Sequence, residues 1–127
     1  MDKVIKARWV NALKSGNYKQ GIEKLRTKDD DGGMIYCCLG VLCDIAFRDE
    51  PGLFPTGWEE QEREDKNESE LFPIRAVWEW AGMKQCDPGA FDIPANGGGP
   101  TIRGTLSELN DKGATFEQIA DCIEEKL

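Results

Sequence analysis

The chain contains no histidine among its 127 residues, so the side chain that most often moves protons near neutral pH is missing. This excludes catalysis by a histidine acid or base, the Ser-His-Asp and Cys-His nucleophile systems, and every zinc site with a histidine ligand. Any chemistry would therefore rest on cysteines, carboxylates and basic groups.

Five cysteines could serve as nucleophiles or metal ligands, namely Cys37, Cys38, Cys43, Cys86 and Cys122. No two of them form a C-x-x-C pair, and Cys38 and Cys43 fall in the most apolar stretch, where a thiol behaves as a small hydrophobe. An odd number of cysteines, together with a charged start that lacks the apolar core of a signal peptide, indicates free thiols in a reducing cytoplasm. We expect these thiols to pack, with no metal and no other cofactor bound.

Carboxylates are abundant, since 24 Asp and Glu residues outnumber 16 Lys and Arg and give a net charge of −8. The acids between Glu59 and Glu70 show no apolar periodicity, which predicts a solvated acidic loop at about 50–71 and makes a carboxylate- and metal-dependent enzyme the least favoured function. Asp44 differs, because it interrupts an apolar stretch. It either meets water on a narrow polar stripe or, if buried, needs a cationic partner such as Arg26.

The charge is also unevenly distributed along the chain. Residues 1–28 carry eight basic and two acidic side chains, whereas residues 29–127 carry eight basic and 22 acidic ones. One interpretation is a basic first element packed beside an acidic body. The other is that the basic end, including Arg26, holds phosphate or that the acidic part imitates nucleic acid.

Two further features could bind a ligand. Asn96-Gly97-Gly98-Gly99-Pro100-Thr101-Ile102-Arg103 precedes an expected helix, and amides of such a loop can hold an anion, with Thr101 and Arg103 as added donors. A flexible connector is the competing interpretation. Trp9 and Trp78 lie on apolar helix faces, but Trp58 and Trp80 do not. Each of these two could stack on a base, anchor a partner or fold back under the loop.

The elements that position these residues follow from periodicity and turn residues. We expect a helix over 2–15, a hairpin with strands at 22–26 and 34–38 around Asp29-Asp30-Asp31-Gly32-Gly33, and a central buried helix over 38–47. A helix follows Pro73, then a loop over 83–102, a helix over 104–110, and a last helix capped by Thr115 with Gln118. The last helix is acidic, so we do not expect it to bind DNA directly.

These elements predict an α+β fold in one domain over 1–127, with about five helices and one small β-hairpin around the central helix. No run is apolar enough to span a membrane, so we expect a cytoplasmic protein. Helical apolar stripes serve cores and interfaces alike, which leaves a homo-oligomer open.

Several blocks of the sequence resemble a group of small proteins encoded by phages and prophages. The most specific block is Tyr36-Cys-Cys-Leu-Gly-Val-Leu-Cys-Asp44, and the others are Trp9 to Gly16, Val77 to Gly82, Leu106 to Gly113 and Phe116 to Asp121. The resemblance implies a viral origin and carries over no functional residue. Small acidic phage proteins without catalytic groups often block a host protein or capture a defence signal.

Two hypotheses follow. The first is a non-enzymatic binding protein that disables a host factor, either as an anti-defence inhibitor or as a nucleic-acid mimic. The second is a protein that captures a nucleotide-derived immune signal, using ligand-binding residues drawn from Arg26, Trp58, Trp80, Gly97, Gly98, Gly99, Thr101 and Arg103. An inhibitor should present a charged or aromatic surface, whereas a captor should carry a pocket.

Overall fold

The most apolar stretch of the chain forms the central helix, α2 (Cys38–Asp49), around which the other elements pack. In the computed structural model, which describes residues 1–63, 70–94 and 99–127, α2 buries nine consecutive residues from Cys38 to Ala46. A helix that is apolar on almost all sides needs neighbours on almost all sides. The expectation of a central buried helix is confirmed.

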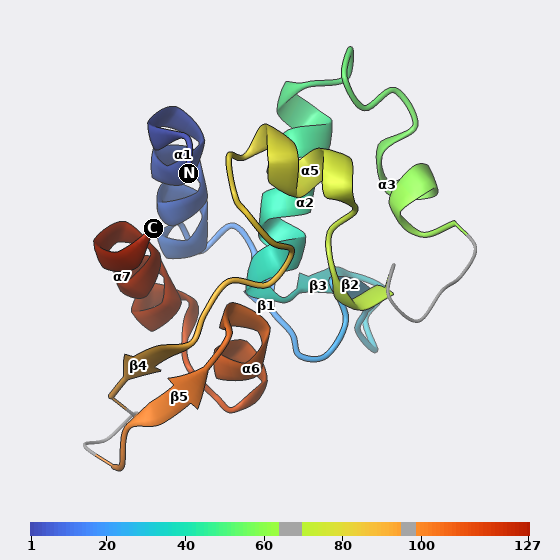
Figure 1. Ribbon diagram of the computed structural model, residues 1–127. Helices are drawn as coiled ribbons and strands as arrows, with labels where there is room; N and C mark the ends of the chain where they lie inside the picture. Colours follow the sequence, from blue (N-terminus) through green and yellow to red (C-terminus); the bar gives the residue numbers. More distant parts are fainter. Residues whose placement is uncertain (64–69, 95–98) are drawn as a thin grey trace.

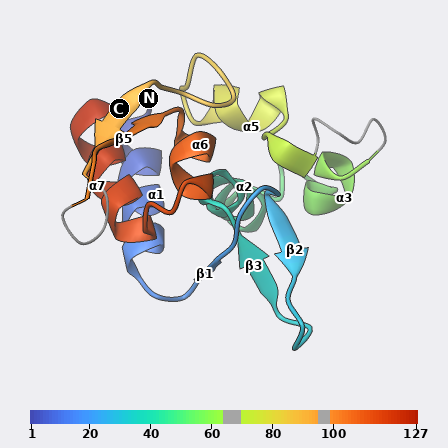
Figure 2. The same ribbon diagram turned by 90° about the horizontal axis from the view of Figure 1, so that it is seen from below.

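The two terminal helices, α1 (Lys3–Lys14) and α7 (Phe116–Lys126), lie side by side (Figures 1 and 2). Asp2 caps α1 by accepting hydrogen bonds from the amides of Val4 and Ile5. Thr115 and Gln118 form the capping box that the sequence predicts at the start of α7. Trp9 is fully buried, and its indole Nε1 donates to the Cys38 carbonyl at 2.9 Å, so α1 is joined to the start of α2.

A three-stranded sheet lies beside α2 in the order β1 (Lys19–Gln20), β3 (Met34–Tyr36), β2 (Arg26–Lys28). β1 is parallel to β3, and β2 is antiparallel to β3 with Arg26 opposite Tyr36. The sequence places the first hairpin strand at 22–26, four residues too early. Residues 22–25 cannot extend as a strand, because Glu23 has φ of 70° and the Lys24 amide bonds back to the Ile22 carbonyl.

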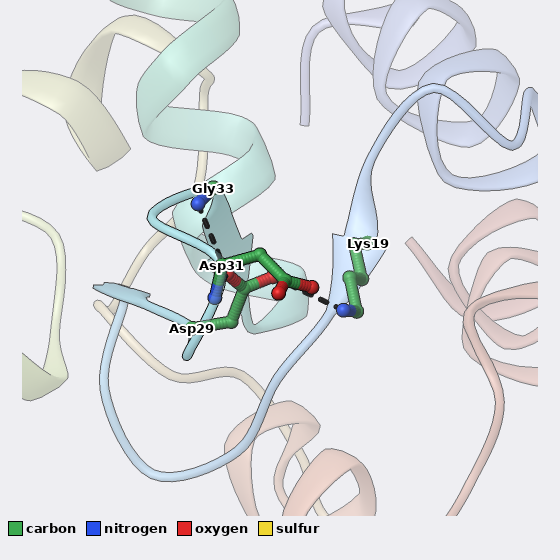
Figure 3. A network of polar contacts seen from close by, with 4 residues as sticks. All are labelled: Lys19, Asp29, Asp31 and Gly33. Carbon is green, nitrogen blue, oxygen red and sulfur yellow. Dashed lines mark hydrogen bonds and ion pairs between the residues drawn. The ribbon is translucent and has the colours of Figure 1, made fainter.

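The turn between β2 and β3 is built on Asp29, as the Asp- and Gly-rich sequence predicts. Asp29 Oδ1 accepts the amides of Asp31 and Gly33, both at 2.9 Å, and Lys19 Nζ lies 3.1 Å from Oδ2 (Figure 3). The Lys19 ammonium and these amides lower the pKa of Asp29. The Asp29 carboxylate is thus already in an ion pair with a lysine of the same chain.

The acidic segment expected to be irregular contains a short helix, α3 (Gly57–Gln61), followed after the undescribed residues 64–69 by α5 (Arg75–Trp80). Gln61 is fully buried and joins the two parts: its Nε2 donates to the Phe72 carbonyl at 2.9 Å, and its Oε1 accepts the Ile74 amide at 2.8 Å. These bonds position α3, and with it Trp58, against α2.

The segment expected as a loop over 83–102 contains a second hairpin, β4 (Phe91–Ile93) with β5 (Ile102–Gly104). Gly104 ends β5, and the following helix α6 covers Leu106–Asp111, so the predicted helix start at 104 is wrong. Helix α6 begins only at Leu106 because Thr105 caps it in a capping box with Glu108.

The fold class is α+β in a single small domain, as predicted. In the described ranges it has six helices and two small sheets, so α3, strand β1 and the β4–β5 hairpin are additions to the predicted elements. Within those same ranges, no helix is both long and apolar enough to cross a membrane.

Candidate binding site

Asp44 is the centre of a buried polar cluster that reaches the surface at Trp58. Its side chain lies on α2 and its residue is 4% exposed, yet its carboxylate accepts hydrogen bonds from three side chains: one from the connection before β1, one from α2 itself and one from α3. Tyr18 Oη and Arg48 Nε each lie 2.6 Å from Oδ2, and Trp58 Nε1 lies 3.0 Å from Oδ1. The buried alternative for Asp44 is therefore correct, but its cationic partner is Arg48, one helical turn away, and not Arg26.

The pKa values of three side chains around Asp44 are all raised. Burial and the hydrogen bond to Asp44 raise the pKa of Tyr18, and burial also raises the pKa of Tyr36. The nearby carboxylate raises the pKa of Arg48. Both tyrosines are therefore neutral near neutral pH, and Tyr18 acts as a hydrogen-bond donor to the carboxylate.

Trp58 connects this cluster to the surface. Its ring centroid lies 5.2 Å from that of Phe47 and 6.2 Å from that of Tyr36. The guanidinium carbon of Arg26 lies 4.1 Å from the Trp58 ring centroid, a cation–π distance. Arg26 is also bound by both oxygens of Glu62, at 2.9 and 3.1 Å. We call Arg26, Trp58 and Glu62 the Arg26–Trp58 stack.

A hollow of about 120 Å³ lies beside the stack, lined by Lys24, Leu25, Arg26, Thr27, Trp58, Glu62 and Glu70. Pockets for drug-sized ligands usually measure roughly 300–1,000 Å³, so this hollow has room for one side chain rather than a nucleotide. Its two basic and two acidic residues are already paired, Lys24 with Glu70 and Arg26 with Glu62.

The structure brings together only two of the residues proposed as ligand-binding, Arg26 and Trp58. Trp80 lies on α5, folded back so that its ring is 6.1 Å from that of Phe54. Gly99 and Thr101 are exposed in the connection between β4 and β5, while Gly97 and Gly98 lie outside the described residues. Arg103 Nη1 contacts both oxygens of Asp92, at 3.0 and 2.9 Å.

The glycine-rich stretch was expected immediately before a helix, but β5 separates it from α6. The amides at the start of α6 have internal acceptors: the Glu108 amide bonds the Thr105 hydroxyl, and the Ser107 amide bonds Asp87 at 2.9 Å. The geometry therefore does not support an anion site in which this stretch and the helix start act together.

Four of the five cysteines are buried, and Cys86 is half-buried. Burial raises the pKa of Cys37 to about 11, and raises those of Cys38 and Cys43 well above their ordinary range. These thiols are protonated near neutral pH and pack as small apolar groups. In the described ranges, no three Cys, Asp or Glu side chains are grouped so that they could hold a metal ion.

The conspicuous block from Tyr36 to Asp44 has structural roles that spacing does not reveal. A Cβ on Gly40 would lie 1.7 Å from the Leu25 carbonyl oxygen, so only glycine allows the chain before β2 to cross α2. That same carbonyl accepts the Cys37 amide at 3.1 Å. Asn110 completes the junction, because its Oδ1 accepts the Cys38 amide and its Nδ2 donates to the Gly21 carbonyl.

Sequence reasoning missed Tyr18, Tyr36, Arg48 and Glu62 as members of the site. For Arg48 a signal existed, because it lies four residues after Asp44 on the polar stripe of α2. Tyr18, Tyr36 and Glu62 lie 26, 8 and 18 residues from Asp44, with no spacing that marks them.

The uneven charge of the chain is largely paired in the fold. Five of the eight basic residues in 1–28 form ion pairs with acids from 29–127: Arg8–Asp49, Lys14–Asp121, Lys19–Asp29, Lys24–Glu70 and Arg26–Glu62. Lys3, Lys6 and Lys28 have no ion-pair partner within the described part of the chain. The geometry thus matches a basic first element packed beside an acidic body.

Comparison with protein families gives one match, to a domain of unknown function, DUF8296, over residues 1–127. The chain belongs to the DUF8296 family. No curated protein matches the chain. No solved structure matches it either.

Proposed function

We propose that this DUF8296 protein is a non-enzymatic binding protein that acts by occupying a protein partner. The observation that carries the proposal is the Arg26–Trp58 stack. Arginine and tryptophan are the side chains most enriched at energetic centres of protein interfaces. Here both are partly exposed and both are oriented before any partner arrives, Trp58 by Asp44 and Arg26 by Glu62.

Orientation before binding matters because an interface loses free energy when it immobilises flexible side chains, about 0.5–1.5 kcal/mol for each. The Asp44 cluster lowers that cost for Trp58, and the bidentate contact to Glu62 lowers it for Arg26. The adjoining hollow of about 120 Å³ has the size of a single partner side chain. These features support a protein partner.

The resemblance to phage-encoded proteins adds that the partner is a host factor and that the protein is an anti-defence inhibitor. Nucleic-acid mimicry has less support. The exposed acids of α7, Glu117, Asp121 and Glu124, do form one stripe, but Lys14 lies 2.7 Å from Asp121 in its middle. Capture of a nucleotide-derived signal also has less support, because the proposed ligand residues lie apart and Arg103 is paired with Asp92.

The test is native mass spectrometry of the purified full chain before and after incubation with a bacterial host extract. We expect an adduct of protein size in the wild type that is lost in Arg26→Ala. The matched control is Arg75→Ala, which removes an exposed arginine that also lies over a tryptophan, Trp78, on a different helix. It should keep the adduct.

Two outcomes would contradict the proposal. A mass gain of a few hundred daltons with no protein adduct would support capture of a small molecule. Equal loss of the protein adduct in the Arg26→Ala and Arg75→Ala proteins would mean that the Arg26–Trp58 stack is not the binding surface.

A further inference from the structure

β2 is an edge strand of its sheet, because the order β1-β3-β2 leaves one of its sides unpaired. In Figure 2 the β2–β3 hairpin extends away from the helices, with β2 on its outer side. Edge strands with open amides and carbonyls can pair with an extended segment of another chain, and proteins often protect them for that reason. Only some of the main-chain amides and carbonyls of β2 lie on this unpaired side.

The hydrogen bonds at both ends of the hairpin show which residues of β2 bond to β3. The Cys37 amide bonds the Leu25 carbonyl, and the Asp29 amide bonds the Gly33 carbonyl. In an antiparallel pair, alternate residues exchange both main-chain bonds, so Leu25, Thr27 and Asp29 face β3. The amides and carbonyls of Arg26 and Lys28 therefore point away from the sheet. No main-chain bond from another described residue reaches them.

The basic residues on β2 and just before it differ in how they are matched by acids. The Glu70 carbonyl accepts the Leu25 amide at 2.7 Å, and the Glu70 carboxylate lies 3.7 Å from Lys24 Nζ. The next basic residue, Arg26, is matched by Glu62. Lys28 continues the alternation of Lys24 and Arg26 but has no acidic partner in the described residues. Among the described residues, Lys24 and Arg26 are thus paired with acids, whereas the Lys28 side chain and the outward main-chain groups of Arg26 and Lys28 have no such partner.

We propose that β2 binds an extended acidic segment of the protein partner as an added strand, with main-chain bonds to Arg26 and Lys28 and a carboxylate opposite Lys28. The inference rests on the proposed function and names the partner's chemistry. A neighbouring side chain of the segment would enter the hollow beside the Arg26–Trp58 stack, since that hollow is lined by β2 residues Arg26 and Thr27. Alternate side chains supply specificity in such pairings.

A second copy of this chain fits the edge less well. Pairing of two β2 strands would place Arg26 and Lys28 of one copy beside the same basic residues of the other, and like charges across a strand pair are destabilising. A partner strand with acidic residues has the opposite charge at the same positions. The charge pattern of the edge therefore favours an acidic partner.

The test uses the full chain and the synthetic peptide acetyl-Thr-Glu-Val-Glu-Val-Glu-Thr-amide, with the same peptide carrying Lys in place of Glu as its counterpart. We expect the acidic peptide to shift the amide NMR signals of Arg26 and Lys28 and to slow their hydrogen exchange at least tenfold. The lysine peptide should do neither. The Lys28→Pro variant removes one outward amide without touching the ladder, and it should lose the effect.

Two further variants separate charge from strand pairing. Lys28→Glu keeps the main chain and should weaken the acidic peptide at least tenfold, whereas the control Lys3→Glu, an exposed lysine on α1, should leave binding unchanged. Equal binding of both peptides, or unchanged binding by Lys28→Pro, would overturn the inference. Concentration-dependent dimerisation that Lys28→Pro abolishes would overturn the choice of occupant.

Failure of the inference can be distinguished from failure of the proposed function. If the Lys28→Pro and Lys28→Glu proteins still form the protein-sized adduct in host extract, the proposed function stands and strand addition is refuted. If the peptide binds as expected but no protein adduct forms with the wild type, strand addition stands and the proposed function is refuted.

Discussion

Two arginine–tryptophan pairs lie on this molecule, and they differ in what holds them. In the Arg26–Trp58 stack the guanidinium carbon lies 4.1 Å from the ring centroid, and the Arg26 side chain is 20% exposed. In the Arg75–Trp78 pair on α5 that distance is 5.4 Å, and the Arg75 side chain is 75% exposed. Glu62 binds Arg26 with two contacts, whereas Glu79 binds Arg75 with one at 3.3 Å.

A common side-chain pair becomes a rigid surface when residues from separate elements hold it. Arg75, Trp78 and Glu79 are neighbours within one helix, so their contacts form wherever α5 forms. Arg26, Trp58, Glu62 and Asp44 come from β2, α3 and α2, and they meet only in the complete fold. If this contrast is correct, substitutions in the Asp44 cluster and the Arg26–Trp58 stack should have larger effects than matched substitutions around Arg75.

Replacing Asp44 should destabilise the protein most. Asp44→Ala leaves Tyr18, Arg48 and Trp58 without their shared acceptor, and breaking such a buried charge cluster typically costs about 3–5 kcal/mol. The equivalent change in the other pair, Glu79→Ala, should cost less than about 0.5 kcal/mol, because that ion pair is exposed. Urea unfolding followed by circular dichroism measures both. Equal losses would refute the contrast.

Gly40→Ala should also destabilise the Arg26 region strongly. The added methyl would lie 1.7 Å from the Leu25 carbonyl oxygen, so the strand leading to Arg26 has to move, at a cost of about 3 kcal/mol or more. Gly52→Ala is the matched control, because a Cβ there meets no atom within 4 Å. Thermal unfolding of the two variants should differ clearly, and Gly40→Ala should also reduce Arg26–Trp58 contacts seen by NMR.

Stability should fall as the pH rises above about 9. The folded state raises the pKa of Cys37 from 9.0 to about 11, so its contribution is complete below pH 9 and is lost on the way to pH 11. One such proton corresponds to about 1.4 kcal/mol per pH unit. Tyr18, whose pKa is also raised, adds a loss that begins near its ordinary value of 10.0.

Variants can show which side chain causes each loss of stability at high pH. Tyr18→Phe should remove the share of Tyr18 in the loss that begins near pH 10 and leave that of Tyr36, whose pKa is also raised, whereas Arg75→Ala should leave the pH profile of stability unchanged. Urea midpoints measured from pH 7 to 11 provide the comparison. A Tyr18→Phe profile identical to that of the wild type would contradict the role of Asp44 in keeping Tyr18 protonated.

The smallest expected effect concerns the two arginines themselves. Arg26→Ala should cost about 1–2 kcal/mol, because it removes a partly desolvated cation–π contact and a bidentate ion pair. Arg75→Ala should cost less than about 0.5 kcal/mol, and added salt should abolish even that. If salt removed both effects equally, the Arg26 contacts would be no more protected from water than those of Arg75.

The local structure of this protein follows from its sequence, because local structure depends on neighbours in the chain. Helical periodicity predicted α1, α2 and α7, and the Thr115–Gln118 capping box follows from spacing alone. The Asp29 turn is likewise specified by adjacent Asp and Gly residues. Burial of the central helix followed from its composition, and so did the packing role of Cys38 and Cys43.

Which distant residues form the site depends on how the elements pack in the folded chain. Asp44 had two open alternatives, and the partner suggested for it was Arg26, whereas the fold pairs it with Arg48, Tyr18 and Trp58. The position of β2 depended on Glu23 and on the close approach of Leu25 to Gly40, neither of which has a periodic signal. Hydrogen bonds and ring contacts between separate elements depend on how those elements pack, and packing is a property of the whole chain rather than of any local pattern.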